Sequence, residues 1–299
     1  MVFSPLPPLP SVSRRTALRA AVGCLLPATA TLGWANLVEP HWLSVSFHPL
    51  SIRGLPGQWQ GKRLVHISDL HIGRVDREFL VTALHQVNAL RPDLLVVTGD
   101  FIDSAYPAAV AEVADILDTL RPATIASLAC LGNHDYGPNR RDLDLADAVA
   151  AAAEKARIEV LRNRSLELDG LEIIGLDDFW SPRYRAKPSL ERAQAGRPTI
   201  CLCHNPDVCD QPVWGDFQGV ILAGHTHGGQ CRPPYFRPPI LPVRNKNYVE
   251  GFHAVGRERM LYINRGLGYT LRVRFNCRPE ISVFELLASS GDDAQVSPS

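Results

Sequence analysis

Two successive strand–helix–strand units restrict the fold of this chain more than any other feature of its sequence. Residues 62–68 and 93–98 are short apolar runs, typical of strands buried on both faces. Between them, residues 76–90 place their apolar side chains on one helical stripe, opened by Asp76 and closed before Pro92. Because two strands joined by a helical crossover lie parallel, the pattern predicts an α/β fold.

The unit repeats at once, and polar residues follow each strand. Residues 107–120 have helical spacing, and residues 125–131 form a third strand. The polar clusters after the three strands are Asp69-Leu70-His71, Gly99-Asp100-Phe101-Ile102-Asp103 and Gly132-Asn133-His134-Asp135. Parallel strands end at one edge of a sheet, and that edge is where α/β proteins bind ligands. We therefore expect one site there.

The second half of the chain has fewer helices and more strands. We predict helices at 142–156 and 189–195, a hairpin of 165–168 and 171–175, and strands at 158–161, 199–203, 219–223, 260–264 and 280–286. Strands gathered in this way favour a second sheet packed on the first. Apolar residues at 45% and charged residues at 21% are ordinary for a globular protein, so a packed core is expected.

Two further polar clusters, His204-Asn205-Pro206-Asp207 and Gly224-His225-Thr226-His227-Gly228-Gly229, follow strands in the second half. All five clusters together offer more ligands than one metal ion uses, so we predict two divalent ions. The first is assigned to Asp69, His71, Asp100 and His227, and the second to Asp100, Asn133, His204 and His225. Asp100 bridges, because a carboxylate has two oxygens to share. Nitrogen and oxygen ligands favour Mn, Fe or Zn.

A pair of divalent ions clamps a phosphoryl group and activates a water for its hydrolysis. In such a reaction His134 is assigned to the side of the leaving group, as general acid or as a donor to the transition state. Asp135 or Asp103 would orient its ring. The alternatives are a hydrogen-bonded turn for His134 and a cap of the following segment for Asp103. A lone histidine is more often structural, and it is the joint pattern that favours a site.

Four arginines are candidates for binding the substrate phosphate, because guanidinium is a bidentate partner for phosphate. They are Arg140, Arg183, Arg185 and Arg265. Arg265 is preferred because it comes just after a strand, and for each of the four a solvated surface charge is the alternative.

Residues 1–40 are interpreted as a signal or membrane anchor. Arg14 and Arg15 precede an apolar run over 20–38 and resemble a signal read by the twin-arginine translocase, except that Ala17 stands where Phe is usual. A plain secretory signal, an uncleaved anchor associating with the membrane and a leader without function are the alternatives. We expect the domain, 41–288, at the extracytoplasmic side or, alternatively, on the inner membrane facing the cytoplasm. Residues 289–299 are predicted to be a disordered tail.

The net charge bears on the substrate class, and the spacing of the cysteines bears on the core and on disulfides. The formal net charge of zero gives no basic field for nucleic acid, so a small phosphoester or a lipid-linked phosphate is the better substrate class. Cys201 and Cys203 alternate within a predicted strand and are expected in the core. A disulfide between Cys209 and Cys231 is left open.

The ordered set of motifs resembles the calcineurin-like metallophosphoesterases, over residues 63–285. The resemblance rests on Asp69-x-His71, Gly99-Asp100-x-x-Asp103, Gly132-Asn133-His134-Asp135, His204 and Gly224-His225-x-His227. The last two motifs and the leader are similar to the bacterial exported or membrane-associated phosphodiesterase branch. What this implies is a four-layer α/β/β/α sandwich with two mixed sheets, and hydrolysis of phosphoesters by a metal-bridging hydroxide.

Three functions are compatible with these observations. The first is a metal-dependent phosphodiesterase or phosphomonoesterase. The second follows from relatives that the resemblance implies, which cleave the pyrophosphate of UDP-diacylglucosamine, a lipid precursor. The third is a non-catalytic metal-binding or scaffold protein, which predicts missing ligand positions.

Overall fold

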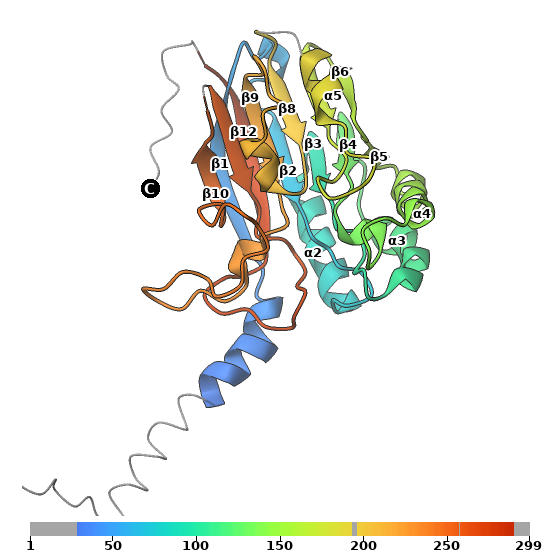
Figure 1. Ribbon diagram of the computed structural model, residues 1–299, viewed down its shortest axis with the longest axis vertical. Coiled ribbons are helices and arrows are strands. Elements are labelled where there is room, and N and C mark those ends of the chain that lie inside the picture. Colours follow the sequence, from blue (N-terminus) through green and yellow to red (C-terminus); the bar gives the residue numbers. More distant parts are fainter. Residues whose placement is uncertain (1–28, 193–195, 257, 290–299) are drawn as a thin grey trace, which may run out of the picture.

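Two six-stranded sheets form the centre of this computed structural model, which describes residues 29–192, 196–256 and 258–289 (Figure 1). The first sheet has the order β1 (Ser44–Arg53), β12 (Glu280–Ser289), β2 (Arg63–Ile67), β3 (Leu94–Thr98), β4 (Ala126–Cys130) and β5 (Glu159–Val160). Strands β2 to β5 are parallel, and β12 lies antiparallel beside β2. The predicted parallel arrangement is confirmed.

The second sheet has the order β10 (Gly251–Ala254), β11 (Arg259–Ile263), β9 (Gly219–Ala223), β8 (Thr199–Leu202), β7 (Leu171–Gly175) and β6 (Arg164–Leu168). Its four central strands are parallel, and its edge strands β10 and β6 are antiparallel to their neighbours. The structure therefore confirms an α/β fold with two mixed sheets.

Three apolar layers hold the sheets and helices together. Between the sheets, Leu64 and Val96 of the first share a buried cluster with Leu202 and Leu222 of the second. The outer face of the first sheet is covered by α2 (Arg77–Leu90), α3 (Val110–Leu117) and α4 (Leu143–Lys155) (Figure 1). Irregular segments, the helix α5 (Ala186–Arg192) and the short helix η6 (Pro206–Asp210) cover the second sheet. The fourth layer of the sandwich is thus mostly loops.

Helix starts follow from local hydrogen bonding. The Asp76 carboxylate accepts the backbone N–H of Phe79 at the start of α2, and Asp142 accepts that of Leu145 at the start of α4. Both starts match the prediction. Helix α5 begins three residues earlier than predicted, because Pro188 falls in its first turn, where no backbone N–H is needed. Its predicted last residues, 193–195, lie outside the described residues.

Two strands, β1 and β10, were not predicted, and both lie at sheet edges. Pro49 within β1 interrupts the usual strand pattern, but an edge strand tolerates the missing N–H. Strand β10 has only four residues and no buried one. Strand β12 runs to Ser289, one residue into the predicted tail, and 290–299 lie outside the described residues.

The N-terminal segment is helical from residue 29 and ends as η1 (Trp34–Val38) and η2 (Glu39–His41). It is fastened to the domain, because buried Glu39 accepts the N–H of Cys277 and the carbonyl of Ala35 accepts the N–H of Arg274. Arg14 and Arg15 lie outside the described residues. Within the described ranges, no helix is both long and apolar enough to cross a bilayer.

The cysteines in the described ranges carry free thiols. Cys201 and Cys203 are buried on the outer face of the second sheet, as predicted. Cys209 and Cys231 are not joined by a disulfide, which settles the alternative left open by the sequence.

Candidate metal centre

The carboxyl ends of both sheets converge and bring the predicted metal ligands together. The first sheet contributes Asp69 and His71 after β2, Asp100 after β3 and Asn133 after β4; the second contributes His204 after β8 and His225 and His227 after β9. All seven side chains are buried. Segments more than 150 residues apart in sequence thus supply one centre.

A first group consists of Asp69, His71 and His227. The Nε2 atoms of His71 and His227 are 3.2 Å apart, and His227 Nε2 is 3.4 Å from Asp69 Oδ1. The other ring nitrogen of His71, Nδ1, is 3.3 Å from Asp103 Oδ2. Two imidazole nitrogens and one carboxylate oxygen therefore converge on one point.

A second group consists of Asp100, His204 and His225. His204 Nε2 is 3.1 Å from Asp100 Oδ2 and 3.2 Å from His225 Nδ1. The outer nitrogens of both rings donate to backbone carbonyls, His204 Nδ1 to Thr98 at 2.7 Å and His225 Nε2 to Pro242 at 2.9 Å. These donations leave the inner nitrogens as lone-pair donors to a cation.

Asp100 lies between the two groups. Its Oδ2 is 3.1 Å from His204 Nε2 in the second group and 3.6 Å from His71 Nε2 in the first. Its Oδ1 accepts the backbone N–H of His134 at 2.8 Å. The carboxylate is therefore placed to be shared, as the bridging role predicted from sequence requires.

The donor set fits divalent cations. The facing lone pairs of His204 Nε2 and His225 Nδ1 repel each other unless positive charge lies between them. Asn133 Oδ1 is buried and has no hydrogen-bond partner in the described part of the chain, and such orphaned atoms are rare. Imidazole nitrogens with carboxylate and amide oxygens are ligands that first-row divalent metals accept.

The pKa values of the ligand side chains also indicate that positive charge is stabilised between them. Although burial opposes it, Asp100 raises the pKa of His204 to about 10. Burial and the neighbouring His204 lower the pKa of His225 to about 3. Burial raises the pKa of Asp69. In the absence of metal, protons thus compensate part of the negative charge.

The backbone at the ligands adopts an uncommon conformation. Asp69, His71, Asp100, His225 and His227 all have positive φ angles, between 49° and 71°. Residues other than glycine rarely adopt this region, and each instance costs about 1 kcal/mol or more. Five of the seven predicted ligands thus lie on strained backbone.

The turn before His225 requires glycine for a different reason. A Cβ atom at Gly224 would collide with the Ser68 side chain and would lie 2.5 Å from Asp69 Oδ2. Because the hydroxyl and the carboxylate occupy that space, only glycine lets β9 approach β2 closely enough to close the first group.

His134 stands beside the first group, with its ring centroid 4.6 Å from that of His71. Its Nδ1 accepts the backbone N–H of Ser104 at 3.0 Å, so the ring proton resides on Nε2. Burial lowers the pKa of His134 to about 4, which keeps the ring neutral near pH 7. A neutral ring with an Nε2–H is able to donate to a substrate oxygen.

Asp103 lies closer to the ring of His71 than to the ring of His134. Its Oδ2 is 3.3 Å from His71 Nδ1 and 3.9 Å from His134 Nδ1. Arg74 donates to both oxygens of this carboxylate. Asp103 is therefore a positioning residue for His71, a contact that sequence spacing did not reveal.

Asp135 binds backbone N–H groups and does not contact the ring of His134, which it was considered to orient. Its two carboxylate oxygens accept the backbone N–H groups of Ile102 and Gly132, so it ties the loop after β3 to the loop after β4. In the described residues, the contact that orients the His134 ring comes from Ser104. Burial raises the pKa of Asp135 to about 7.

The four candidate arginines are placed differently. Arg265 pairs with Glu280 at 3.2 Å and lies 3.6 Å from Glu250, and it lines a cavity beside Trp34 rather than the metal centre. Arg183 pairs with Asp147, and Arg185 donates to backbone carbonyls. Arg140 is the one of the four that lines the cavity of the centre.

That cavity has a volume of about 190 Å³ and two kinds of wall. Polar residues of the centre, including Asp100, Asn133 and His134, line it. Arg140 stacks over the Trp180 ring at 4.0 Å, and Trp180 lies edge-on to His225. Apolar side chains, among them Pro239, Ile240 and Leu271, line the same cavity and form its apolar wall.

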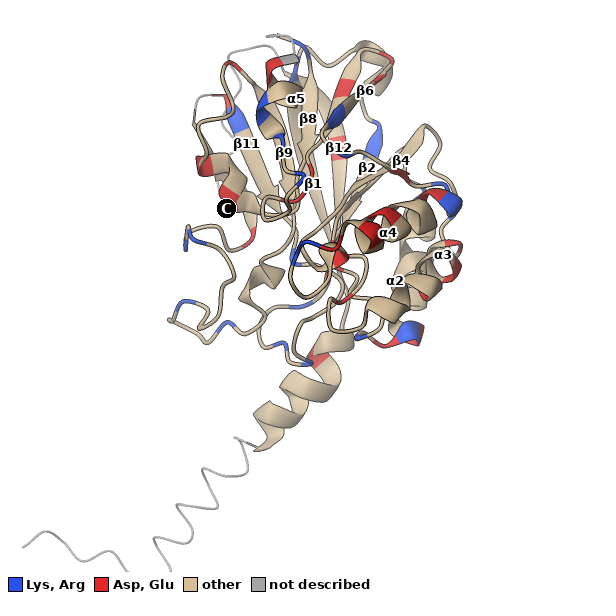
Figure 2. Cartoon of the chain, turned by 45° about the vertical axis from the view of Figure 1, so that its right-hand side comes forward, with Lys and Arg blue, Asp and Glu red and all other residues tan. Residues whose placement is uncertain are grey.

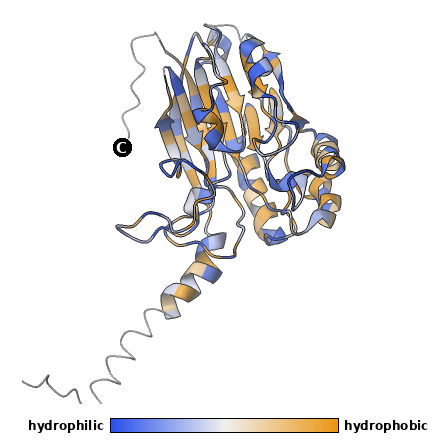
Figure 3. Cartoon of the chain, in the orientation of Figure 1, coloured by the Kyte–Doolittle hydropathy of each residue, from blue (hydrophilic) through white to orange (hydrophobic). Residues whose placement is uncertain are grey.

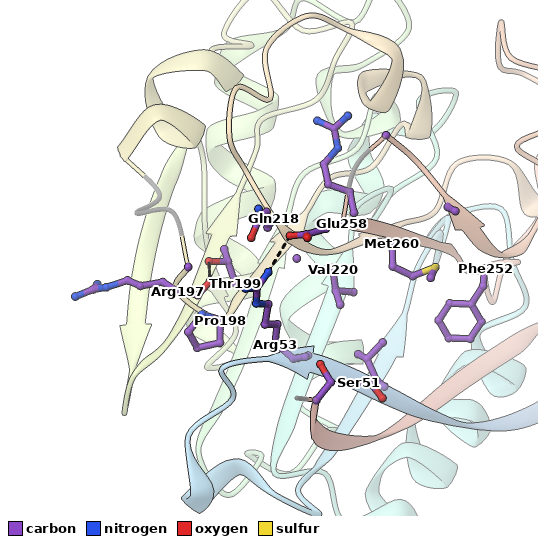
Figure 4. Close-up of a pocket in the computed structure, with 18 residues that line it drawn as sticks. Ser51, Arg53, Arg197, Pro198, Thr199, Gln218, Val220, Phe252, Glu258 and Met260 are labelled. Atoms are coloured by element: carbon purple, nitrogen blue, oxygen red, sulfur yellow. Dashed lines mark hydrogen bonds and ion pairs between the residues drawn. The ribbon is translucent and has the colours of Figure 1, made fainter. Parts of the chain in front are cut away.

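A second cavity, of about 330 Å³, opens at the other end of the second sheet. Val220, Phe252 and Met260 line it, and the ion pair of Arg53 with Glu258 crosses it (Figure 4). None of the metal-ligating groups found in the described ranges borders this cavity.

Sequence reasoning did not single out Asp178 and Trp180. Asp178 is buried, its Oδ1 accepts the N–H of Trp180, and its Oδ2 is unpartnered within the described residues. Burial raises the pKa of Asp178 to about 7. The signal was available, because Asp177 and Asp178 follow β7 at the same sheet edge as the five clusters.

Comparisons with known proteins agree with this geometry. Residues 62–229 match the model of the calcineurin-like phosphoesterase family. The chain belongs to this family. It is accordingly a metal-dependent phosphoester hydrolase, and the non-catalytic alternative is set aside because all the predicted ligands come together.

Three relatives resemble nearly the whole chain. Bacillus subtilis YkuE, an uncharacterized metallophosphoesterase, is 34% identical and aligns with 93% of this chain and 99% of its own length. Escherichia coli phosphodiesterase YaeI is 30% identical over 92% and 100% of the two chains. UDP-2,3-diacylglucosamine pyrophosphatase LpxG of Chlamydia trachomatis is 29% identical over 85% and 92%.

Proposed function

We propose that this chain is a phosphodiesterase that works with two divalent ions. The observation that carries the proposal is the position of Asp100 Oδ2, which is within 3.6 Å of an inward ring nitrogen in each ligand group. Two ions, when bound, supply an activated water and polarise the phosphoryl oxygens. Asp69, His71 and His227 would hold one, and Asn133, His204 and His225 the other, with Mn, Fe or Zn suited to these ligands.

The residues around the ligands complete the proposed chemistry. His134, neutral and protonated on Nε2, donates to the leaving oxygen, and the Ser104 N–H holds its ring in that tautomer. Arg140, which lines the cavity, binds a phosphate oxygen, and stacking on Trp180 fixes its guanidinium.

A second candidate function is hydrolysis of a pyrophosphate in a lipid-linked nucleotide. The apolar wall of the cavity, with Ile240 and Leu271, favours it, because a substrate with an apolar part would bury surface there. The relative LpxG, named as a UDP-2,3-diacylglucosamine pyrophosphatase, supports the same candidate function.

Turnover of two substrates by the Mn-loaded protein tests these functions. Bis-p-nitrophenyl phosphate should be hydrolysed, whereas exclusive turnover of UDP-diacylglucosamine would favour the second function. Asp100→Asn should reduce turnover to background and lower bound metal, measured by elemental analysis. Glu154→Gln, an exposed change on α4, is the control and should change neither. Near-normal kcat in Asp100→Asn would contradict the bridging role.

We also propose that the chain acts at the extracytoplasmic side. The alternative is that it lies on the inner membrane with its domain facing the cytoplasm. The support is the leader, where Arg14 and Arg15 precede apolar residues. Fusing residues 1–45 to a reporter active only after export tests it. Export lost on replacing both arginines by lysine would indicate the twin-arginine translocase, and an inactive wild-type fusion would contradict export.

A further inference from the structure

Exposed apolar side chains are concentrated in three segments. Of the twelve large apolar residues that are exposed in the described ranges, nine lie there. They are Leu32, Trp34, Leu37, Val38 and Trp42, then Tyr235, Phe236 and Ile240, and finally Leu271. We call these nine residues the apolar rim. Monomeric proteins seldom expose such a concentration of apolar surface without a binding role.

The segments of the apolar rim adjoin one another and the metal centre. Trp34 and Trp42 line one cavity together with Pro234, and Ile240 and Leu271 line the cavity of the metal centre. Figure 1 shows the helical segment (blue) and the loop carrying Tyr235 (orange) at the same end of the molecule, and Figure 3 shows apolar residues along that helix. The rim thus continues from the cavity of the metal centre to the N-terminal helix.

The two loop segments of the apolar rim carry positive charge only, and the helical segment contains one acidic residue, the buried Glu39. Residues 231–249 and 266–279 contain seven Lys and Arg residues and no Asp or Glu. Arg237 and Arg272 are exposed, and neither pairs with a carboxylate of the described chain. Figure 2 shows Lys and Arg (blue) spaced along the loops at this end. Because the whole chain has 31 basic and 31 acidic residues, the chain outside these two segments is net acidic.

We propose that the apolar rim docks on an anionic lipid bilayer. Trp and Tyr with aliphatic neighbours partition into the headgroup region, and Arg beside them binds anionic lipid. A second copy of the chain fits less well, because a symmetric contact would bring the unpaired Arg237 and Arg272 of both copies to one interface without acidic partners, whereas an anionic bilayer complements them.

Docking in this way gives the proposed hydrolase its substrate class. Ile240 and Leu271 belong both to the rim and to the wall of the catalytic cavity. A phosphoester on a lipid headgroup can therefore enter the cavity while its acyl chains stay in the bilayer. This consequence rests on the proposed function, whereas the docking itself does not.

Vesicle sedimentation of the full-length protein tests the docking. Wild type should bind phosphatidylcholine vesicles containing phosphatidylglycerol better than pure phosphatidylcholine. The variants Phe236→Ser/Ile240→Ser and Arg237→Glu/Arg272→Glu should each bind the anionic vesicles about tenfold more weakly. The controls Phe47→Ser and Arg121→Glu, exposed elsewhere, should bind as wild type does. Wild-type binding in both rim variants would overturn the proposal.

A local probe keeps the test valid if residues 1–28 also bind the membrane. Tyr235 is fully exposed, so Tyr235→Trp adds a fluorophore to the rim without removing a contact of the core. Brominated lipid should quench this added emission, and it should not quench that of Arg121→Trp. Equal quenching of both, or none, would overturn the docking. Concentration-dependent dimerisation lost in Phe236→Ser/Ile240→Ser, without vesicle binding, would instead assign the rim to a second copy.

Turnover separates this inference from the proposed function. The Arg237→Glu/Arg272→Glu variant and the single variant Phe236→Ser should hydrolyse soluble bis-p-nitrophenyl phosphate at the wild-type rate, since none of these three residues lines the cavity of the metal centre. A wild-type protein that binds vesicles through the rim and does not hydrolyse phosphoesters would contradict the function alone. A protein that hydrolyses them and ignores the rim substitutions would contradict the docking alone.

Discussion

Asp100 combines three constraints in one residue. Its Oδ1 is held by the N–H of His134, its Oδ2 faces both ligand groups, and its backbone has a positive φ of 52°. The conformation costs energy that a glycine would largely avoid. Its presence indicates that the negative charge and its placement outweigh that cost, since the surrounding hydrogen bonds fix the strained turn.

Replacing His134 by Gln tests the proton donor at the scale of one side chain. Because Gln keeps a polar group without an acid–base function, kcat should fall by about 10²–10⁴-fold. Metal content should stay at the wild-type level, which elemental analysis checks. The loss should shrink with substrates whose leaving group needs no proton, such as p-nitrophenolate. An equal loss for all leaving groups would contradict the assignment.

Residue identities at the centre could be read from sequence because polar residues after parallel strands share an edge. The hydrogen-bond and ion-pair partners of these residues could not be read from sequence. Whether Asp103 lies nearer His71 or His134 depends on how Arg74 pairs with it, and that pairing is tertiary. Arg265 follows a strand, as a phosphate ligand would, but folding brings Glu280 and Glu250 against it.

At the scale of elements, the short helix η6 (Pro206–Asp210) supports the second ligand group indirectly. Asp207 accepts the backbone N–H groups of Arg244 and Asn245, at 2.7 and 3.0 Å. The same loop carries the Pro242 carbonyl that accepts the Nε2–H of His225. Asp207 is therefore a positioning residue for His225.

Asp207→Ala should loosen this support. Two backbone N–H groups lose their partner, so the free energy of unfolding should fall by about 1–3 kcal/mol. Affinity for metal should fall by about 10–100-fold, because the outer partner of a histidine ligand is disturbed. Chemical unfolding and metal titration measure the two effects. The control is Asp210→Ala, which removes contacts to the side chains of Asn245 and Tyr248 only. Equal metal affinity in both variants would count against the link.

Elements in the interior of the sheets were predictable, and those at the edges were not. The apolar runs of β2, β3, β8 and β9 are buried on both faces, so their composition alone identifies them. Strands β1 and β10 are half solvated and owe their pairing to β12 and β11, which are distant or weakly patterned in sequence. Local propensity cannot report pairing of that kind.

At the scale of the whole molecule, each ligand group combines both sheets. Asp69 and His71 from the first sheet meet His227 from the second, and Asp100 meets His204 and His225 in the same way. Bound ions would therefore cross-link the two halves of the sandwich.

Removing metal should consequently lower stability as well as activity. An ion present at about 100 times its dissociation constant adds about 2.7 kcal/mol, which corresponds to about 5–10 °C in Tm for a domain of this size. Calorimetry with Mn and after chelation measures the difference, and Asp100→Asn should show a much smaller one. A wild-type Tm that does not respond to metal would contradict the cross-link.

His66 should make the stability of the whole domain sensitive to acid. Burial lowers the pKa of His66 from 6.5 to about 3, and its Nε2 is 2.8 Å from Thr98 Oγ1. Between these values the unfolded chain binds a proton that the folded chain excludes, so stability falls as pH decreases. At pH 5 the loss from this residue is about 2 kcal/mol.

Denaturant unfolding at pH 7 and pH 5 checks this slope. His66→Gln keeps an N–H for Thr98 and has no titrating group, so it should lose about 2 kcal/mol less than wild type between the two pH values. The exposed His85→Gln on α2 is the matched control and should follow wild type. Parallel behaviour of all three proteins would show that His66 is not the responsible group.

The alternation of the two sheets within each ligand group also sets an order on biosynthesis. A ribosome releases the strands of the first sheet before those of the second, so a nascent chain holds Asp69, His71 and Asp100 long before His227 exists. Until that residue emerges and β9 docks, neither ligand group is complete. Catalytic competence is thus a late event in the life of the polypeptide, and a half-made molecule cannot attack phosphoesters.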